Sequence, residues 1–365
     1  MLNTSTGNYT VIFMSVLIFL KKKILMTNWI CLRPWFMLEF YNYFDNEAYT
    51  FVSPCGDSWH SENFKKIKMP YVKDITDIKN VWNGEILQQW RQSILDGSYS
   101  FCDKNRCLLY RSKFNLAHRD LIFDDIRYNK TTLDHGPTML GYSADRSCNL
   151  SCASCRNSPI LRTNTCGFSS FLSCLKDKDV KRFNMNTSGE TFFNHTTLEF
   201  LRKFKRDDYP NIEEIYLVTN GTRLNEEMWE TLGDSKEVIK KISVSVDAGT
   251  EETYLKIRKF KFTRLKENLI FISSLKKRGI IKVFRLNFVV QYRNVHEINI
   301  FCLLAKELEC NMIRIDKMND WQHLSRQKLS DLQVDENSDE YKKQVFLLQE
   351  FIIQNPHIQV VTNLT

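Results

Sequence analysis

Short apolar runs alternate with segments of helical periodicity along most of the chain after Pro137. The apolar or β-branched runs predict strands, and they occupy 138–144, 182–187, 214–219, 241–246, 283–290 and 312–316. Between them, apolar residues recur at helical spacing, most clearly over 198–204, 226–232, 265–279 and 296–310. Six strand–helix units in succession predict an α/β fold with a parallel sheet, which either lies open or curls into a partial barrel. In such folds ligands bind at the carboxyl ends of the strands.

The chain before Pro137 has a different pattern, rich in aromatic residues and largely irregular. One helix interrupts it, because apolar residues recur at helical spacing from Val81 to Leu95 and Gly97 supplies a stop. Four cysteines flank this helix, two before it and two after it. Residues 111–137 are polar and mixed, which predicts a linker.

These patterns divide the chain into five predicted parts. They are an N-terminal extension (1–26), a small irregular cysteine-rich domain (27–115), a linker (116–137), an α/β core (138–320) and a C-terminal part with one helix and one strand (321–365). The length of 365 residues suits one large catalytic domain with an appendage.

The composition excludes two classes of protein. With 43% hydrophobic and 26% charged residues the chain has an ordinary globular composition. It is therefore expected to bury a sizeable core, and to be neither a disordered polymer nor a multi-span membrane protein. The net charge is +8, but the basic residues are interspersed with acidic ones, which gives little support for a nucleic-acid partner.

An apolar run over 11–20, followed by three lysines, is the one stretch with the character of a targeting signal. It is too short to cross a bilayer, which needs about 20 apolar residues, and it lacks the basic start of a secretory signal. We interpret it as an extension outside the core, with a membrane-surface helix as the alternative. Met26 is an alternative start of translation. We expect a cytoplasmic protein with no membrane partner.

The strongest chemical signal is the segment CNLSCASC, directly after the first predicted core strand. It places Cys148, Cys152 and Cys155 on one loop. Three thiolates can bind three irons of a four-iron cluster and leave the fourth iron without a protein ligand. That iron can chelate the amine and carboxylate of an amino acid, whereas a structural site is closed by a fourth ligand. The alternatives are three core thiols, or a zinc site completed by Cys166 or Cys174.

The cysteine spacing, its position after the first core strand and the order of the later motifs resemble the radical SAM superfamily. Its members cleave S-adenosylmethionine (SAM) and adopt a partial (β/α)6 TIM-like barrel. The resemblance covers residues 138–320, about half of the chain. It implies that a reduced four-iron cluster passes one electron to the sulfonium of SAM, giving methionine and a 5′-deoxyadenosyl radical that abstracts hydrogen from a substrate.

The resemblance also implies which residues contact SAM. Ser188, Gly189 and Glu190 resemble the family's Gly-Gly-Glu-Pro segment, which meets the methionyl amine. A carboxylate suits an ammonium, and glycine allows close backbone approach. The further candidates follow later strands: Asn220 in a Thr-Asn-Gly turn, Ser245 and Asp247 at ribose-contacting positions, Arg258 for the SAM carboxylate, and Asn287 at the level of the cofactor.

Each of these assignments has a structural alternative. Asn220 and Asp247 are common turn residues, and Glu190 can cap the helix that follows it. Two positions depart from the family pattern: Thr191 replaces the usual proline, and Ser154 stands where many members carry an aromatic residue. The second departure puts the usual packing beside the adenine in doubt.

The four cysteines of the N-terminal part are Cys31, Cys55, Cys102 and Cys107. They resemble the ligands of the SPASM or twitch domain, an auxiliary iron–sulfur domain that typically follows the radical SAM barrel and here precedes it. Four thiolates suffice to close a second four-iron cluster with no open iron. A tetrathiolate zinc site uses the same ligands and is the alternative.

The other cysteines and the histidines receive no functional role. Cys302 and Cys310 lie on, and near the end of, an apolar helix face, which favours core packing. His135, His195 and His323 are scattered without the spacing of metal ligands.

The substrate is predicted only by class. Family members with an auxiliary cluster often modify peptides or proteins, so we expect a peptidyl or small polar substrate, with a sugar-linked or nucleotide-like substrate as the alternative. An electron donor such as a flavodoxin or ferredoxin is also implied. The alternative from another functional class is a zinc-stabilised binding protein without catalysis. The missing fourth ligand beside Cys148, Cys152 and Cys155 argues against it.

Overall fold

The chain is described here from a computed structural model. It describes residues 29–41, 51–56, 60–61, 70, 72–112, 124–161, 167–185, 188–318 and 326–364. The predicted extension over 1–26, Cys166 and His323 lie outside the described residues. Within the described ranges, no helix is both long enough and apolar enough to cross a membrane.

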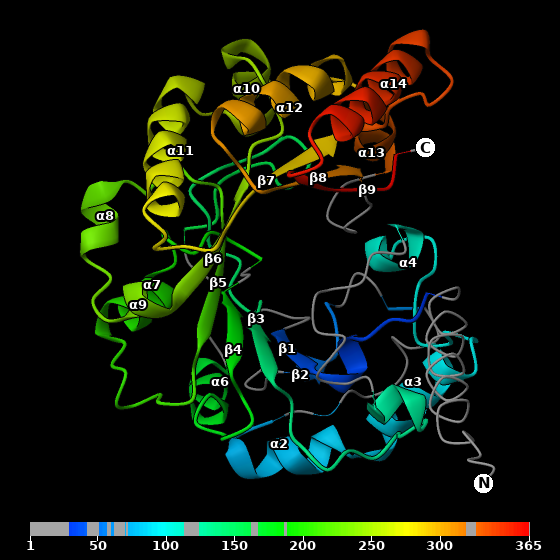
Figure 1. Ribbon diagram of the computed structural model, residues 1–365, viewed down its shortest axis with the longest axis vertical. Coiled ribbons are helices and arrows are strands. Elements are labelled where there is room, and N and C mark those ends of the chain that lie inside the picture. The colour runs from blue at the N-terminus through cyan, green and yellow to red at the C-terminus, as the bar shows by residue number, and fades with distance from the viewer. Residues whose placement is uncertain are drawn as a thin grey trace, which may run out of the picture.

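The strands of the described chain form one curved sheet (Figure 1). In their order across the sheet they are β2 (Phe51–Ser53), β1 (Met37–Tyr41), β3 (Met139–Tyr142), β4 (Arg182–Met185), β5 (Glu214–Thr219), β6 (Ile239–Ser245), β7 (Val283–Val290), β8 (Met312–Lys317) and β9 (Gln359–Thr362). All neighbours are parallel except β1 and β2. The predicted α/β class and the six core strands, β3 to β8, are confirmed, and the sheet is that of a partial TIM-like barrel.

The two faces of the sheet differ in chemistry. In β7, Phe284, Leu286 and Phe288 are fully buried on the side of the covering helices. The alternate residues Arg285 and Asn287 are only partly buried and point to the opposite side. We call this opposite side the inner face. It is polar, which is unusual for the interior of a small barrel and marks it as a place for a ligand.

The helices that follow the core strands cover the outer side of the sheet (Figure 1). They are α6 (Phe168–Cys174), α7 (His195–Lys203), α8 (Glu226–Glu230), α9 (Ser235–Val238), α10 (Glu251–Arg258), α11 (Phe262–Lys277) and α12 (Ile298–Glu307), the last preceded by the 3₁₀ turn η4 (Val295–Glu297). Two more helices, α13 (Arg326–Leu332) and α14 (Asp339–Gln354), lie towards the C-terminal end.

Several of these helices begin at a side chain that caps them. The side-chain oxygens of Asn194, Asn225, Thr250 and Ser338 accept a backbone N–H from the first turn of α7, α8, α10 and α14. Such caps satisfy donors that would otherwise lack a partner. They fix the point where each strand-to-helix loop ends, which is where the predicted site residues lie.

The N-terminal part contains η1 (Arg33–Trp35), α2 (Ile75–Trp82), α3 (Glu85–Leu95) and α4 (Leu108–Ser112). The prediction of a single helix in this part is wrong in one respect, because the helical conformation is interrupted at Asn83 and Gly84. The Asn83 side chain leaves the helix to exchange two hydrogen bonds with the backbone of Leu133, at 2.8 and 2.9 Å. The predicted stop at Gly97 is confirmed, with a positive φ of 77°.

Strands β1 and β2 were not predicted from the sequence. The residues of β1 are all buried, so the alternation that marks a half-exposed strand is missing. β1 lies parallel to β3, with Met37 opposite Met139. The N-terminal part thus extends the core sheet, and one continuous hydrophobic cluster includes Trp35, Trp82 and Phe183.

Arg91 anchors the N-terminal part from within. Its side chain is fully buried, and its guanidinium donates to the carbonyl oxygens of Pro34, Trp82 and Thr131 at 2.6–2.8 Å. It also lies 4.5 Å over the ring of Trp82. Because burial disfavours the charge, the pKa of Arg91 is lowered to about 9.

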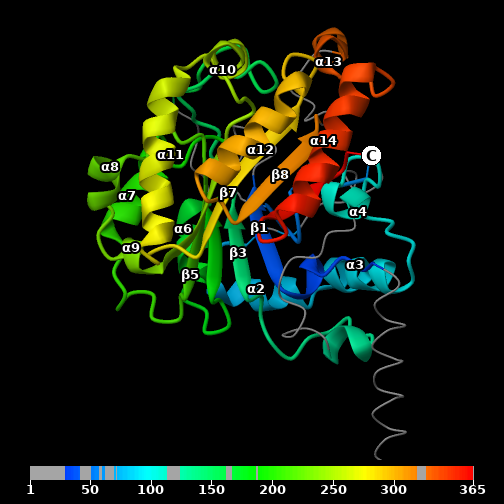
Figure 2. The same ribbon diagram turned by 45° about the horizontal axis from the view of Figure 1, so that its top comes forward.

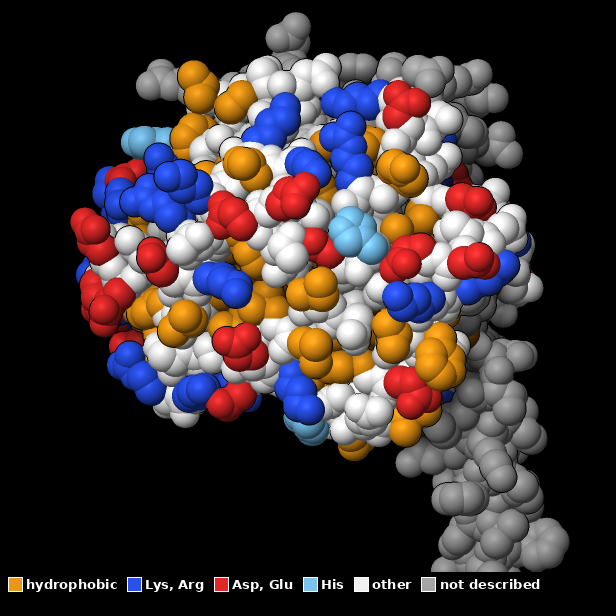
Figure 3. Space-filling model, turned by 90° about the horizontal axis from the view of Figure 1, so that it is seen from above, with side chains coloured by type: hydrophobic (Ala, Val, Ile, Leu, Met, Phe, Trp, Pro, Cys, Tyr) orange, Lys and Arg blue, Asp and Glu red, His pale blue; other side chains and the backbone are white. Residues whose placement is uncertain are grey.

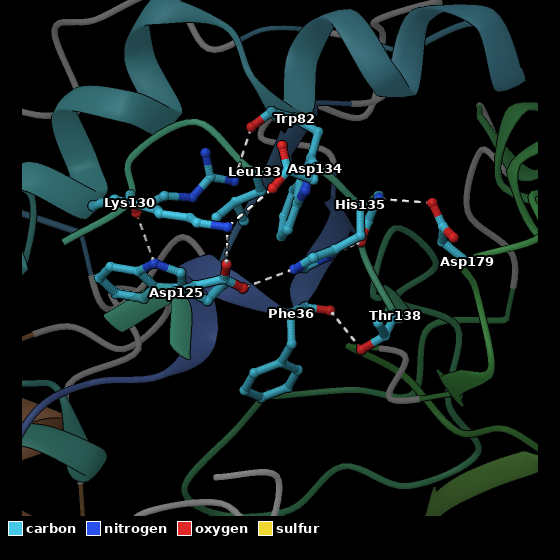
Figure 4. Close-up of polar contacts among 12 residues, drawn as sticks. Phe36, Trp82, Asp125, Lys130, Leu133, Asp134, His135, Thr138 and Asp179 are labelled. Atoms are coloured by element: carbon cyan, nitrogen blue, oxygen red, sulfur yellow. Dashed lines mark hydrogen bonds and ion pairs between the residues drawn. The ribbon is translucent and has the colours of Figure 1, made fainter. Parts of the chain in front are cut away.

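The linker before β3 is held by a polar cluster (Figure 4). Asp125 lies 3.0 Å from Nε2 of His135 and 3.3 Å from Nζ of Lys130. The backbone N–H of Gly136 donates to Asp179 at 2.7 Å. His135, which received no role from the sequence, therefore fixes the linker between the N-terminal part and the core.

The surface around α10, α12 and α14 carries charges of both signs. Basic and acidic side chains are interspersed over this face (Figure 3). The distribution matches the mixed charge pattern of the sequence, in which 51 basic residues are balanced by 43 acidic ones.

Candidate functional site

The segment after β3 forms a short loop that carries the three predicted cysteines. We call Cys148, Cys152 and Cys155 the three-thiol loop. The backbone of Cys148 exchanges two hydrogen bonds with Ile160, at 2.7 and 3.1 Å, which closes the loop on itself. The N–H of Ala153 donates to Ile257 at the end of α10 at 2.8 Å, which ties the loop to the core.

Hydrogen-bond donors surround the three sulfur atoms. Arg156 Nε lies 3.3 Å from the Sγ of Cys155, and Arg258 Nη1 lies 3.5 Å from that of Cys152. The backbone N–H of Leu150 and the amide of Asn220 approach Cys148 Sγ at 3.5 and 3.8 Å. Donors and cations directed at sulfur stabilise the thiolates that bind iron.

The pKa values of the loop thiols reflect burial in the metal-free chain. Burial raises the pKa of Cys148 to about 11, against a donor from Leu150. Burial also raises the pKa of Cys152, and Arg258 partly opposes this. Cluster binding would therefore release protons from this loop.

A fourth protein ligand does not join the loop among the described residues. No group of three or more His, Cys, Asp or Glu there is placed to hold a single metal ion. Cys174 lies on α6, and the charges that act on its pKa come from Asp74, Asp177 and Asp77. The zinc alternative that uses Cys174 therefore lacks a geometric basis, while Cys166 lies outside the described residues.

Glu190 holds the loop and the end of β5 together. Its carboxylate accepts from the backbone N–H of Asn220 at 2.5 Å, from the Thr219 hydroxyl and from the backbone N–H of Phe192. Its own N–H donates to the carbonyl of Ser147 at 2.8 Å. Burial raises the pKa of Glu190, and these donors oppose the shift. The side chain is thus committed to protein donors.

Gly189 is required by the loop itself. A Cβ at this position would lie 2.0 Å from the carbonyl oxygen of Ser147, which no side chain tolerates. The close backbone approach that the sequence predicted for Gly189 is therefore made to the three-thiol loop. Ser188 is exposed beside it, with its hydroxyl donating to the carbonyl of Ser143 at 2.8 Å and its own carbonyl accepting from Arg156 at 2.9 Å.

Asp247 and Arg258 form a buried ion pair at 2.5 Å. Asp247 has a positive φ of 63°, and it accepts the N–H of Val289 at 2.8 Å. The structure thus joins two residues that the sequence assigned to separate parts of SAM. Burial opposes the charge of Arg258, but Asp247 and Cys152 more than offset this, so its pKa is raised. Arg258 Nε is buried and has no partner among the described residues.

Ser245 and Asn287 lie opposite each other on β6 and β7. Asn287 donates to Ser243 at 2.8 Å, and its amide oxygen is buried without a partner in the described chain. Two unsatisfied groups, this oxygen and Arg258 Nε, therefore lie near the strand ends that border the three-thiol loop. Buried polar atoms without partners are rare and suit a ligand that supplies them.

The four N-terminal cysteines are linked by electrostatic interactions. We call Cys31, Cys55, Cys102 and Cys107 the four-thiol group. The pKa of each is raised by burial first. Charges of the other three act on Cys55, those of Cys31 and Cys107 act on Cys102, and that of Cys107 acts on Cys31. For Cys31 the pKa rises to about 12. The grouping of cysteines from four separate segments stays a prediction, which these electrostatic interactions support.

Donors and cations also face the four-thiol group. The Trp90 side chain donates to Cys102, and backbone N–H groups donate to Cys31 and Cys107. Arg33 lowers the pKa of Cys31, Cys55 and Cys107, and Arg314 of β8 does so for Cys107. α4, next to Cys107, lies near the C-terminal end of the chain in Figure 1 and Figure 2. The group therefore borders the inner face.

Both groups of thiols fit iron–sulfur clusters in donor type and surroundings. Thiolate ligands, N–H donors and cations together are what such clusters require. By number of thiols alone, three ligands would leave one iron of a four-iron cluster open and four ligands would leave none. Cys302 and Cys310 are buried in the core, as predicted.

Three contributors to these sites were missed by sequence reasoning. Arg156 follows the last cysteine directly, so its position was a usable signal. Trp90 and Arg314 lie far from the cysteines in the sequence, and only the fold brings them close.

No protein-family model matches the chain, and no curated protein sequence matches it. Among solved structures, radical SAM enzymes are similar at low identity. SuiB of Streptococcus suis bound to S-adenosylmethionine is 12% identical (TM-score 0.46; 78% of this chain, 62% of that one). Native anSMEcpe with bound AdoMet and the Cp18Cys peptide is 20% identical (0.46; 61% and 63%). TYW1 with a lysine-pyruvate adduct is 17% identical (0.39; 58% and 73%). The chain thus spans less than two thirds of SuiB.

Proposed function

We propose that the chain is a radical SAM enzyme in which the three-thiol loop holds a four-iron cluster with one open iron. The loop itself carries this proposal. Its three thiols are met by Arg156, Arg258 and Asn220. Among the described residues, no three His, Cys, Asp or Glu are placed to hold a single metal ion, which disfavours a mononuclear zinc site there. A structural site has no use for an open position, whereas a catalytic one requires it.

When bound, such a cluster supplies one electron to the sulfonium of SAM, whose cleavage yields the 5′-deoxyadenosyl radical that removes a hydrogen atom from a substrate. The chain's residues position the reactants. Arg258 favours the anionic form of the Cys152 sulfur, and Asp247 orients Arg258. Glu190 locks the end of β5 against the loop. Ser188, Ser245 and Asn287 are the proposed contacts to SAM.

We assign the four-thiol group to a second, closed cluster. Residues 27–115 then act as a SPASM/twitch-like auxiliary domain, with a linker over 116–137, the radical SAM core over 138–320 and a C-terminal part over 321–365. The position of Arg314 supports this, because its charge acts both on Cys107 and on the inner face. Cys31, Cys55, Cys102 and Cys107 would hold this cluster, which would supply one-electron chemistry beside the inner face.

The proposed substrate is peptidyl or small and polar, and the polar inner face supports this class. A sugar-linked or nucleotide-like substrate is the alternative. The electron donor is proposed to be a flavodoxin or ferredoxin, in the cytoplasm.

The test is metal analysis of protein purified without oxygen and reconstituted with iron and sulfide. We expect about eight irons per chain, and about four after Cys148, Cys152 and Cys155 are replaced by Ala. Replacing the four-thiol group should also leave about four. Only the wild type and the variant that lacks the four-thiol group should form 5′-deoxyadenosine with SAM and dithionite.

The matched control is Cys302→Ala, which removes a buried thiol that belongs to neither group. It should keep about eight irons. Stoichiometric zinc with no 5′-deoxyadenosine in the wild type would contradict the proposal and establish the zinc-stabilised binding protein instead.

A further inference from the structure

Arg285 is a cation on the inner face of the sheet. It lies on β7, whose buried residues Phe284 and Leu286 point to the opposite side, against the helices. Its Nε donates to the hydroxyl of Ser243 on β6 at 2.8 Å. Its guanidinium carbon lies 5.3 Å from the ring centre of Tyr216 on β5. These contacts fix the plane of the guanidinium.

The remaining nitrogens of Arg285 have no acceptor among the described residues. Its pKa is lowered by burial first, and the nearby cation of Arg314 adds to this effect. Asp316 is the nearest carboxylate that acts on Arg285, but it forms an ion pair with Arg314. A half-buried cation whose one nearby carboxylate is already paired with another arginine is costly, because burial disfavours charge that is only partly compensated.

Other charges near the inner face occur as pairs. Glu39 of β1 pairs with Arg33 at 3.7 Å. Glu214 of β5 pairs with Lys241 of β6 at 2.9 Å. Arg285 is therefore the cation of this face that lacks a carboxylate partner in the described chain.

Two further polar atoms beside Arg285 are buried without a partner in the described residues. They are the hydroxyl of Tyr216 and the amide oxygen of Asn287. Asn287 shares the hydroxyl of Ser243 with Arg285, at 2.8 Å. The Tyr216 side chain and the Arg285 guanidinium lie beside each other, and the acid group of a ligand would satisfy both the hydroxyl and the cation.

From these contacts we propose that Arg285 binds a carboxylate of the substrate, with the hydroxyl of Tyr216 completing the subsite. The identification of this ligand as the substrate rests on the proposed function, whereas the anion site itself does not. A planar guanidinium with two free nitrogens matches a carboxylate through two parallel hydrogen bonds. The substrate is thereby narrowed to an acid, such as an acidic side chain or a chain terminus of a peptide.

The subsite is placed so that a bound substrate lies close to both thiol groups. On one side, the carbonyl of Asn287 accepts the N–H of Val246, next to Asp247 and its partner Arg258 at the three-thiol loop. On the other side, the charge of Arg314 acts both on Arg285 and on Cys107. An acid held at Arg285 therefore lies between the two groups.

The test is thermal unfolding of the full chain with sodium acetate, inorganic phosphate or acetamide as probes, at constant ionic strength. We expect acetate to raise the unfolding temperature of the wild type by about 2–4 °C at saturation. Arg285→Met should abolish this shift, and Arg285→Lys should keep part of it. Arg278→Met removes an exposed arginine and should respond like the wild type.

An equal acetate shift in wild type and Arg285→Met would overturn the proposal. So would a shift with phosphate but none with acetate, since that would assign the site to a phosphate. The assay needs neither SAM nor turnover. If the wild type shows no acetate response but keeps its iron content and forms 5′-deoxyadenosine, the acid subsite is refuted and the radical SAM assignment is not affected.

Discussion

The two thiol groups are built in opposite ways. The three-thiol loop spans eight residues between Cys148 and Cys155 and takes its shape from one strand end. The four-thiol group draws on segments from Cys31 to Cys107, and the fold must bring them together. A local loop can keep an open metal position because its own backbone fixes the ligands. A group drawn from distant segments becomes ordered only when all four of its thiols bind the same cluster.

The largest effect that would sharpen this contrast is expected from Gly189→Ala. The new Cβ would lie 2.0 Å from the Ser147 carbonyl oxygen, so the backbone under the three-thiol loop must move. We expect a loss of about 3 kcal/mol in the free energy of unfolding and a drop from about eight to about four irons. Urea unfolding and iron analysis measure both.

Gly56→Ala is the control beside the four-thiol group. Its Cβ would lie 3.8 Å from a carboxylate oxygen of Glu39, an ordinary contact. We expect a change of about 0.5 kcal/mol and a full complement of iron. Equal damage from both substitutions would show that the loop does not depend on its close contact with Gly189.

The next effect is expected from Arg258→Met. It leaves the carboxylate of Asp247 buried without its cation, which costs about 3 kcal/mol in the free energy of unfolding of the metal-free chain. Adding Asp247→Asn should restore part of this loss, because the buried charge is then gone. Urea unfolding of the three variants measures the coupling, and strictly additive losses would contradict the pairing.

A smaller effect is expected at the four-thiol group from Trp90→Phe. It removes the N–H donated to Cys102, a hydrogen bond of about 1 kcal/mol, or about 40 mV for one electron. Since N–H donors favour the reduced cluster, the potential of the second cluster should become more negative. Potentiometric titration monitored by EPR measures it. The cluster of the three-thiol loop is the internal control, and a shift there instead would refute the assignment.

The smallest effect concerns a thiol outside both groups. Burial raises the pKa of Cys302 to about 12 from its ordinary value of 9.0. Above pH 9 the unfolded chain therefore loses this proton first, so the free energy of unfolding falls as pH rises, by about 1 kcal/mol at pH 10. Cys302→Ala should lack this part of the pH dependence. Urea unfolding at about pH 8 and pH 10 measures it, and parallel profiles would contradict the raised pKa.

The sequence predicted what depends on local pattern. The core strands β3 to β8 follow from short apolar runs, and the three-thiol loop follows from the spacing of Cys148, Cys152 and Cys155. These features need only neighbours in the sequence. Four of the covering helices, α7, α8, α11 and α12, were predicted for the same reason. The start of α7 is set by the cap at Asn194.

What the sequence did not predict depends on contacts between distant segments. β1 is buried on both faces and shows no alternation, so its place beside β3 could not be read from its own residues. The break at Gly84 is fixed by the pairing of Asn83 with Leu133, 50 residues later. Asp247 and Arg258 were both named as site residues, but their ion pair only appears once α10 packs over the loop.

The parallel pairing of β1 with β3 has a consequence for synthesis. About a hundred residues separate Met37 from its partner Met139, and β1 has no parallel neighbour until the later strand leaves the ribosome. During that interval a largely apolar strand lacks its parallel neighbour on the nascent chain, and such strands pair readily with other chains. Efficient production of this protein should therefore depend on chaperones that shield its first strand during translation.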